Sequence, residues 1–252
     1  MTTKIICCCH RGISNNIDPI IEKYPDVFHF VLGGAAYHKA GSNPFLDSMK
    51  RDDTGENLSW ANPLCSEATS LYWAYKHLDE FEPYDMIGLC HYRRVFDLDY
   101  HNLDPDAVYV KQCDYPIPGH PDYLGNHYSD PGISTLVRDE LIYQFPWIYE
   151  IMRLVEDDFT FFDKEMFIMN RGMFLNYMDY VVQCLRILLD RVLPNVLKWH
   201  RYDPSITTTS FAFSRGCSYF LEYFSLLYFT RLKQQGYRLI VTPLTKESYH
   251  GN

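Results

Sequence analysis

The sequence lacks the signals that mark several large classes of protein. It contains no Walker sequence and no G-x-G-x-x-G motif, which argues against a P-loop NTPase or a dinucleotide dehydrogenase. No stretch approaches the roughly 20 apolar residues that span a bilayer, and the first residues, MTTKIICCCHRG, include no long apolar segment of a secretory signal. Basic residues are also scarce, since the net charge is −9, so we expect no binding to nucleic acid.

Paired cysteine motifs are missing as well. None of the eight cysteines forms a C-x-x-C pair, and three of them, Cys7, Cys8 and Cys9, are adjacent in an expected strand. This pattern is typical of reduced, buried thiols rather than of a disulfide framework or a zinc site. The sequence therefore predicts a cytoplasmic protein.

Apolar and aromatic residues, in contrast, are plentiful. Hydrophobic residues make up 47% of the 252 positions, and the aromatic share of 16% is high. Such a chain can bury a large core and line clefts with tyrosine. It shows no internal repeat, low-complexity run or linker, so we expect a single domain over residues 1–252.

The order of the expected elements predicts an α/β fold. Strands are expected at 4–9, 27–32, 86–90, 108–110, 164–169 and 237–241. Helices are expected at 13–24 (interrupted by Pro19), 65–78, 136–155 (with a break near Pro146), 173–193 (ended by Pro194) and 207–232. Residues 39–63 are expected to form a long polar loop, which is usually functional or disordered. The first sixty residues form a β-α-β unit that opens a mixed, mostly parallel sheet.

Residues 85–96, DMIGLCHYRRVF, are central to the functional prediction. An apolar run, predicted to be a buried strand, changes abruptly into His91, Tyr92, Arg93 and Arg94. In open α/β sheets, ligands bind outside the carboxyl ends of the strands. The arginines could bind a carboxylate or a phosphate. A purely structural pairing with acidic side chains is the alternative.

Two further clusters follow the first two strands. His10 and Arg11 come after the first strand, and Gly33 and Gly34 after the second. If these strands are parallel to the central one, all three clusters share one edge of the sheet. Together with the loop 52–57, that edge could hold a base, a ribose and a diphosphate through arginines and backbone amides.

Three motifs in this order resemble a known family. They are D-T-G-E-N-L-S at 53–59, N-P-x-C-x-E-x-T-x-L-Y-W-A-x-K at 62–76, and I-G-L-C-H-Y-R-R-x-F at 87–96. They are similar to motifs of bacterial capsule, O-antigen and exopolysaccharide glycosyltransferases, a family formerly catalogued as a domain of unknown function that includes galactofuranosyltransferases. The resemblance covers most of the chain.

The resemblance implies a GT-A-like, Rossmann-type domain that transfers a sugar from a UDP-sugar to a glycan hydroxyl on a lipid-linked oligosaccharide. The nucleotide-sugar half would lie at about 1–100 and the acceptor half at about 101–252. Contact with the inner face of the cytoplasmic membrane, or with polysaccharide-assembly partners, is then expected. The implied donor-binding residues are His10, Arg11, Gly33, Gly34, Asp53, Asn57, Lys76, His91, Tyr92, Arg93 and Arg94.

A GT-A enzyme usually carries D-x-D after its central strand, where it holds a divalent cation on the diphosphate. Here His91, Tyr92 and Arg93 occupy that place. Our hypothesis is that arginine neutralises the leaving diphosphate and that no cofactor is required. The alternative is that Asp97 and Asp99, which form a D-x-D pair slightly later, bind Mg²⁺ or Mn²⁺.

An inverting transfer needs a carboxylate base beside the acceptor hydroxyl. The candidates are Asp163, Glu165 and Glu67, although Glu67 could instead cap or neutralise a helix start. His127 and Arg215 are expected to contact the acceptor.

One departure affects the acceptor side. A glutamate usually precedes the position of Arg215 in the family, and Ser214 stands there in this chain. This departure, with the uncertain base, motivates the alternative of a protein that binds nucleotide sugars without turnover. A retaining or hexopyranose transferase of the same fold is a separate alternative, because the sequence does not determine the anomeric outcome.

Overall fold

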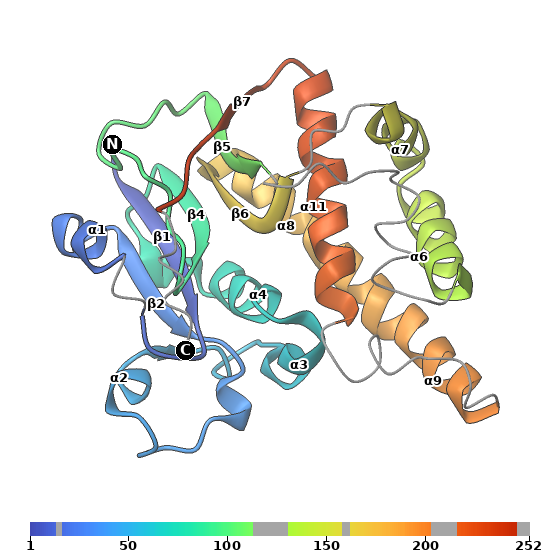
Figure 1. Ribbon diagram of the computed structural model, residues 1–252, viewed down its shortest axis with the longest axis horizontal. Coiled ribbons are helices and arrows are strands. Elements are labelled where there is room, and N and C mark those ends of the chain that lie inside the picture. The colour runs from blue at the N-terminus through green and yellow to red at the C-terminus, as the bar shows by residue number, and fades with distance from the viewer. Residues whose placement is uncertain (14–16, 113–130, 158–161, 203–215, 246–252) are drawn as a thin grey trace.

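A seven-stranded sheet lies at the centre of the protein (Figure 1). The computed structural model describes residues 1–13, 17–112, 131–157, 162–202 and 216–245. The strand order in the sheet is β3-β2-β1-β4-β6-β5-β7. The strands are β1 (Thr3–Cys9), β2 (Phe28–Leu32), β3 (Lys50–Arg51), β4 (Met86–His91), β5 (Ala107–Gln112), β6 (Phe162–Asn170) and β7 (Arg238–Val241).

Most neighbouring strands run parallel. The pairs β1–β2, β1–β4, β2–β3 and β5–β7 are parallel, whereas β6 is antiparallel to both β4 and β5. This confirms the expected α/β fold with a mixed, mostly parallel sheet. Because β1, β2 and β4 are parallel and in register, their carboxyl ends lie at one edge of the sheet.

Side chains of β1 alternate between two hydrophobic cores, one on each face of the sheet. Ile5, Cys7 and Cys9 belong to one core, and Ile6 and Cys8 belong to the other. This alternation, which has a period of two residues in any strand, explains how three adjacent cysteines can all be buried. Burial raises the pKa of the Cys8 thiol well above its usual value, so the thiol stays protonated.

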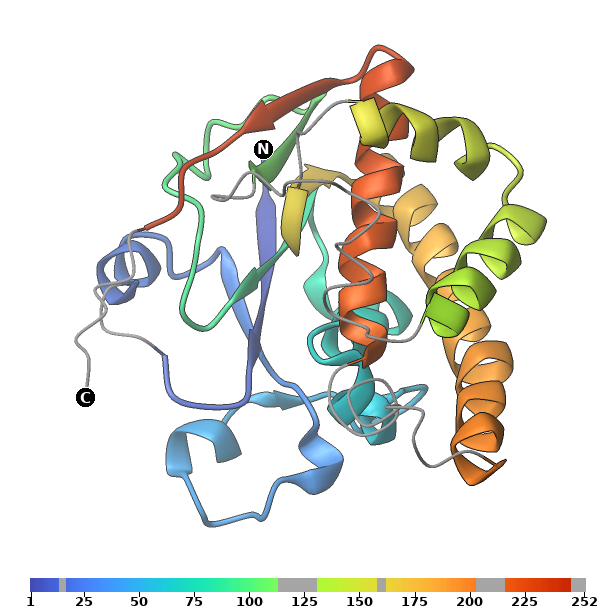
Figure 2. The ribbon, with the colours of Figure 1, turned by 45° about the vertical axis from the view of Figure 1, so that its right-hand side comes forward.

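Helices cover the core that contains Cys8 (Figure 2). The long helices on this side, α8 and α11, pack together and lie against β6. The helices of the described residues are α1 (Asp18–Lys23), α2 (Pro44–Asp47), α3 (Asn62–Cys65), α4 (Ala68–Lys76), α6 (Pro131–Gln144), α7 (Ile148–Asp157), α8 (Arg171–Arg186), α9 (Leu193–Tyr202) and α11 (Gly216–Gln234), with 3-10 turns η1 (Ala35–Tyr37), η2 (Ser59–Ala61) and η3 (Leu78–Phe81) and a π-helical turn η4 (Ile187–Val192). None of them combines the length and apolar character needed to cross a membrane.

Three expectations about helices were wrong in detail. The helix expected at 65–78 is two helices, α3 and α4, because Ser66 between them has a positive φ of 47°. Pro194 does not end the long helix, since the π-helical turn η4 precedes it and α9 begins one residue before it. Pro19 lies in the first turn of α1, where the missing N–H is tolerated, and so interrupts nothing.

The region expected to be a long polar loop, 39–63, is also more ordered than its composition indicates. It contains α2, β3 and η2 and the first residues of α3. Asn43 begins α2 by accepting hydrogen bonds from the amides of Phe45 and Leu46.

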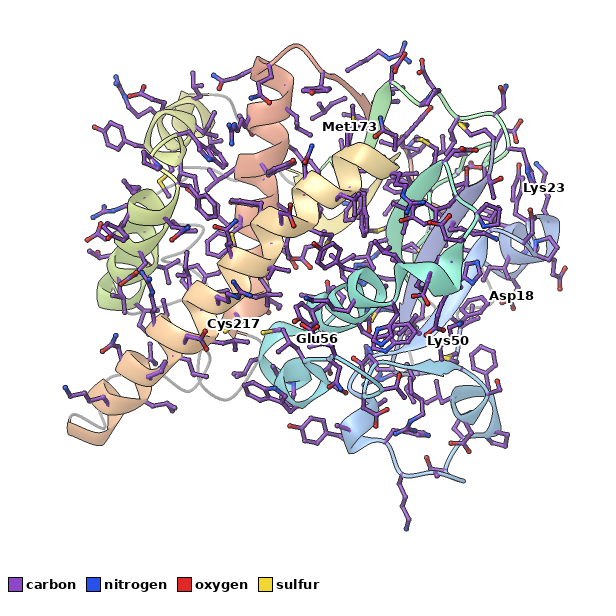
Figure 3. All side chains as sticks on the ribbon, turned by 180° about the vertical axis from the view of Figure 1, so that it is seen from behind. Asp18, Lys23, Lys50, Glu56, Met173 and Cys217 are labelled. Carbon is purple, nitrogen blue, oxygen red and sulfur yellow. The ribbon has the colours of Figure 1, made fainter. Side chains whose placement is uncertain are left out.

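The start of α11, marked by Cys217, lies beside α3 (Figure 3).

Candidate functional site

A pocket opens at the carboxyl ends of β1, β2 and β4, where they meet the turn between α3 and α4. Its volume is about 430 Å³, within the range of roughly 300–1,000 Å³ that is common for small-molecule sites. We call it the edge pocket. Its lining residues are Cys8, His10, Arg11, Gly33, Asn62, Pro63, Ser66, Glu67, His91, Tyr92 and Arg93.

The register of the three parallel strands explains how the predicted clusters converge. Cys8 of β1 is paired with His91 of β4, and Cys9 is paired with Leu32 of β2. The amide of Gly33 donates to the carbonyl of Cys9 at 2.8 Å, and the amide of Tyr92 donates to that of Cys8 at 3.2 Å. The polar residues that follow the strands therefore begin at the same level of the sheet edge.

Tyr92 organises the cationic side of the edge pocket. Its ring packs edge-on against the His10 ring, with 4.7 Å between the ring centroids, and its hydroxyl lies 3.3 Å from Nε2 of His10. The guanidinium carbon of Arg93 lies 5.1 Å from the centroid of the same ring, a cation–π distance. One buried tyrosine thus orients two basic side chains toward the pocket.

Arg94, although adjacent to Arg93, does not line the pocket. Its amide and carbonyl bond back to the carbonyl and amide of His91 at 3.0 and 3.2 Å, which closes a tight turn. Of the three arginines expected to bind the donor, Arg11 and Arg93 line the edge pocket and Arg94 does not.

A strained turn places Glu67 in the edge pocket. Ser66 has φ 47° and ψ −127°, a backbone conformation that only glycine adopts readily. Its carbonyl accepts hydrogen bonds from Asn62 Nδ2 at 2.8 Å and from Thr69 Oγ1 at 3.0 Å, which hold the turn in place. Such strain is most often found at functional sites.

Glu67 itself is 7% exposed, and its carboxylate lies 3.5 Å from Nε2 of His91. It stands at the N-cap of α4, yet its side chain accepts no capping hydrogen bond. The side chain therefore does not cap the helix, whereas the other structural role, neutralising the start of α4, stays a prediction.

Glu165 lies behind the edge pocket and does not line it. It is 3% exposed, and burial, followed by the negative charges of Glu67 and Glu222, raises its pKa well above the usual value. Its Oε2 has no hydrogen-bond partner among the described residues, and its φ of 51° is unusual for a residue with a side chain. The structure thus favours a protonated, enclosed acid at this position.

Three predicted donor-binding residues lie away from the edge pocket. Asp53 forms a two-pronged ion pair with Arg51, with N–O distances of 3.0 and 2.6 Å. Asn57 bonds to the carbonyl of Gly55 and the amide of Ser59, and Lys76 pairs with Glu56 at 2.8 Å. Each of these side chains therefore bonds to nearby residues of the same loop or of α4, against which the loop 53–59 folds.

The contacts between that loop and α4 form what we call the motif cluster. The indole Nε1 of Trp73 donates to Thr54 Oγ1 at 2.9 Å, and the Tyr72 hydroxyl donates to Glu56 at 2.8 Å. Burial and the Glu56 carboxylate raise the pKa of Tyr72 to about 12. The cluster, made of Thr54, Glu56, Tyr72, Trp73 and Lys76, therefore joins two of the recognised motifs to each other.

Asp52 is the polar residue whose importance the sequence did not reveal. It is fully buried and accepts hydrogen bonds from the amides of Gly34 and Ala35, both at 2.9 Å, and from the hydroxyls of Ser59 and Thr69. This network fixes the backbone after β2. The one available signal was a pair of adjacent aspartates in a loop, which does not identify the buried member.

The two glycines after β2 serve packing. A Cβ on Gly33 would lie 2.8 Å from Ser70 Oγ, and a Cβ on Gly34, whose φ is +70°, would lie 2.6 Å from Asn62 Oδ1. Gly33 lines the edge pocket and Gly34 does not. Sequence reasoning also missed Asn62, Pro63 and Ser66 as pocket residues, because their pattern predicted only a helix start.

The D-x-D pair lies outside the edge pocket. Asp99 Oδ1 accepts from the Tyr24 hydroxyl at 3.4 Å and from the His101 amide at 3.3 Å, while Asp97 is exposed. The described residues contain no group of three or more His, Cys, Asp or Glu side chains that could hold a metal ion. The pair therefore does not line the edge pocket, and the alternative that it binds Mg²⁺ or Mn²⁺ stays a prediction.

The remaining predicted residues are two on the acceptor side and one candidate base. His127 and Arg215 lie outside the described residues, as does Ser214. Asp163 belongs to β6, but its side chain is not among those described.

Comparisons with known proteins agree with this architecture. The family model "Domain of unknown function (DUF4422)" matches residues 4–200, whereas no curated protein matches. The apo structure of the bifunctional glycosyltransferase WbbM superposes with a TM-score of 0.66 and 16% sequence identity. The match covers 98% of this chain and 46% of that one, so the chain spans less than half of its length. The fold agrees with the GT-A-like architecture expected from the sequence, and the chain belongs to the DUF4422 family.

Proposed function

We propose that this protein is a glycosyltransferase whose edge pocket binds a nucleotide-sugar donor. The observation that carries the proposal is the convergence of His10, Arg11 and Arg93 with one carboxylate, Glu67, at the carboxyl ends of parallel strands. Cations suit a diphosphate, and a carboxylate suits the activation of an attacking hydroxyl. The fold shared with WbbM, which its description names a bifunctional glycosyltransferase, supports the same activity.

The basic residues have the simpler role. Arg93 is exposed and held over Tyr92, and Arg11 lies across the same opening. Both would bind the diphosphate of the donor and stabilise the negative charge that develops on it as the bond to the sugar breaks. A cation held elsewhere is not needed for this charge balance.

Of the two candidate bases whose side chains the structure describes, Glu67 is the one that the geometry favours. It lines the edge pocket, whereas Glu165 is enclosed behind it. In an inverting transfer, Glu67 takes the proton of the acceptor hydroxyl while the acceptor oxygen bonds to the anomeric carbon. The bond from that carbon to the diphosphate oxygen breaks, and its electron pair leaves with the nucleoside diphosphate.

The finer assignment rests on the motif resemblance. We propose a UDP-sugar donor, with galactofuranose as the first sugar to test, and a glycan hydroxyl of a lipid-linked bacterial surface polysaccharide as the acceptor. The protein would then work at the inner face of the cytoplasmic membrane. The described residues that line the edge pocket lie between positions 8 and 93, which supports donor binding by the first hundred residues. Acceptor binding by the rest of the chain remains part of the proposal.

A panel of UDP-sugars, incubated with a lipid-linked or synthetic glycan acceptor, tests the proposal. Formation of an extended glycan together with UDP supports it, and analysis of the new linkage distinguishes inversion from retention. Binding of UDP-sugars with no product for any donor would favour the non-enzymatic alternative. Repeating the reaction in excess chelator, and then with added Mn²⁺, tests whether the arginines act without a cation.

A further inference from the structure

A second pocket lies on the helical side of the protein, between α8, the last turn of α11 and the junction of α6 and α7. Its volume is about 310 Å³. The aromatic residues that line it are Phe145, Trp147, Tyr180, Tyr228 and Tyr237. None of the sequence motifs contributes to it. We call it the aromatic pocket.

Four of these aromatic side chains, Phe145, Trp147, Tyr180 and Tyr228, form a continuous surface. The Tyr180 ring lies 4.9 Å from that of Phe145, 5.6 Å from that of Trp147 and 5.2 Å from that of Tyr228, measured between centroids. Tyr180 is fixed by a hydrogen bond from its hydroxyl to the carbonyl of Phe224 at 3.1 Å. This surface is therefore rigid and apolar, and it is suited to pack against the C–H face of a ligand.

Polar groups of both signs face the same space. Arg231 stacks over Trp147, with its guanidinium carbon 4.2 Å from the ring centroid, and no carboxylate of the described residues lies within ion-pair distance of it. Asp179 Oδ1 already accepts from the Tyr75 hydroxyl at 2.8 Å, which leaves the other carboxylate oxygen as an acceptor for a ligand. The amide side chains of Asn176 and Gln235 supply both donors and acceptors. One basic and one acidic group leave the pocket close to neutral.

The Tyr228 hydroxyl adds a further polar group. It forms no hydrogen bond with the described residues. Burial raises the pKa of Tyr228 to about 12; the positive charge of Arg231 opposes this rise, and Tyr237 and Asp179 add to it. The hydroxyl is therefore protonated at neutral pH and able to donate. A partner outside the protein chain would satisfy it.

This combination selects one class of ligand. A phosphate or an acidic peptide would gain little, because Asp179 offsets the attraction of Arg231. An apolar ligand would leave the guanidinium and amide groups unpaired. A saccharide has C–H faces for the aromatic rings and hydroxyls for the polar groups. An adjoining hollow of about 340 Å³ shares Gln183 with the aromatic pocket and extends from the end of α8 along η4, so it provides room for more than one sugar.

The aromatic pocket lies far from the edge pocket, so the two pockets are expected to have different roles. Cys217, at the start of α11, lies beside α3, and Arg231 is fourteen residues further along the same helix (Figure 3). At 1.5 Å per residue, this is about 21 Å. That separation suits successive parts of one oligosaccharide rather than one sugar in both pockets.

We propose that the aromatic pocket is a glycan-holding site that binds a neutral part of the acceptor or product saccharide away from the point of transfer. The choice of a saccharide rests in part on the proposed glycosyl transfer. The site retains a long chain and contributes nothing to the chemical step. It therefore affects the binding of polymers but not the reaction of short acceptors.

The test is binding to a panel of purified bacterial O-antigen and capsular polysaccharides by affinity electrophoresis, with saturating UDP present to occupy the edge pocket. Two variants remove pocket groups: Arg231→Met, which keeps an apolar stem over Trp147, and Tyr237→Ala. Each has a matched control outside the pocket: Gln234→Ala beside the pocket residue Gln235, and Tyr143→Ala, an aromatic that is 78% exposed.

We expect the wild-type protein to bind at least one polysaccharide, and Arg231→Met and Tyr237→Ala to bind it at least tenfold more weakly. Both controls should bind as wild type, and all four variants should keep the wild-type melting temperature. Wild-type protein that binds none of the panel, or pocket variants that bind as well as their controls, would overturn the proposal.

Turnover, measured separately with a short acceptor, should be the same in all four variants. Loss of polymer binding in a protein that shows no transfer would sustain the holding site while refuting the proposed enzyme. Sugar transfer by the protein, with polymer binding that the pocket variants do not change, would support the proposed enzyme and refute the holding site.

Discussion

The edge pocket and the motif cluster come from neighbouring parts of the chain but have opposite relations to their surroundings. In the motif cluster, charged and polar side chains bond to one another, as Tyr72 and Lys76 do to Glu56. In the edge pocket, Arg11 and Arg93 are exposed around an opening of about 430 Å³. In the motif cluster, the polar groups are paired within the protein. In the edge pocket, the arginine side chains face an opening in which a ligand could bind.

The comparison teaches that a recognisable motif need not touch the ligand. D-T-G-E-N-L-S and Y-W-A-x-K are bonded together through Trp73 and Thr54. Only part of I-G-L-C-H-Y-R-R-x-F, residues 91–93, reaches the edge pocket. We infer that the first motif and the Y-W-A-x-K part of the second support the turn that presents Glu67. The ligand-binding groups come from the start of the second motif, residues 62–67, and from residues 91–93 of the third. Substitutions in the two regions should therefore affect different measurements.

The largest effect is expected for Glu67→Gln. Loss of a general base typically lowers a rate by about 10²–10⁴-fold, and the amide keeps the shape of the side chain. Initial rates of UDP release with saturating donor and acceptor measure the loss. The matched control is Glu56→Gln in the motif cluster, which should retain at least a third of the wild-type rate. Equal rates for the two variants would remove Glu67 from the proposed mechanism.

The next largest effect is expected for Arg93→Ala. A hydrogen bond to a charged group contributes about 1.5–3 kcal/mol, which corresponds to a loss of about 10- to 150-fold in affinity for UDP. Isothermal titration with UDP measures it directly. Arg94→Ala is the control, since Arg94 has the same chemistry but lies outside the edge pocket. A greater loss in Arg94→Ala than in Arg93→Ala would place the diphosphate elsewhere.

A change in the motif cluster should instead lower stability. Thr54→Val preserves the shape of the side chain but leaves the buried indole N–H of Trp73 without its acceptor. The expected decrease in the free energy of unfolding is about 1–3 kcal/mol, measured by urea denaturation. The affinity for UDP should not change in the folded variant. A large loss of affinity at full stability would show that the cluster itself contacts the donor.

Much of the sheet could be predicted because hydrophobic periodicity depends only on local sequence. Strands β1, β2, β4 and β7 lie within a residue or two of the expected ranges. Parallel pairing then accounts for the meeting of His10, Gly33 and His91 at one edge. The part of the edge pocket that is formed by residues at the strand ends could therefore be predicted from the sequence.

The rest of the site depends on tertiary contacts that leave no local pattern. Ser66 adopts a strained conformation because hydrogen bonds from Asn62 and Thr69 hold it there, and nothing in the sequence marks the break between α3 and α4. Likewise, Asp53 and Asp52 are adjacent and chemically identical, yet one pairs with Arg51 and the other is buried beneath η1 and η2. Composition cannot distinguish them, since the difference arises only when the loop folds onto α4.

The smallest expected effect concerns Glu165 and depends on pH. Because the folded state raises its pKa above the ordinary value of 4.5, proton binding adds stability that is fully present below about pH 4.5 and is lost as the pH rises through the raised pKa. Glu165→Gln removes this dependence. The variant should therefore gain stability relative to wild type as the pH increases from 5 to about 8, as measured by thermal unfolding across that range. A difference between the two proteins that does not change with pH would mean that Glu165 is ionised in the folded state, and Glu165 would then be a second carboxylate beside Glu67 rather than an enclosed acid.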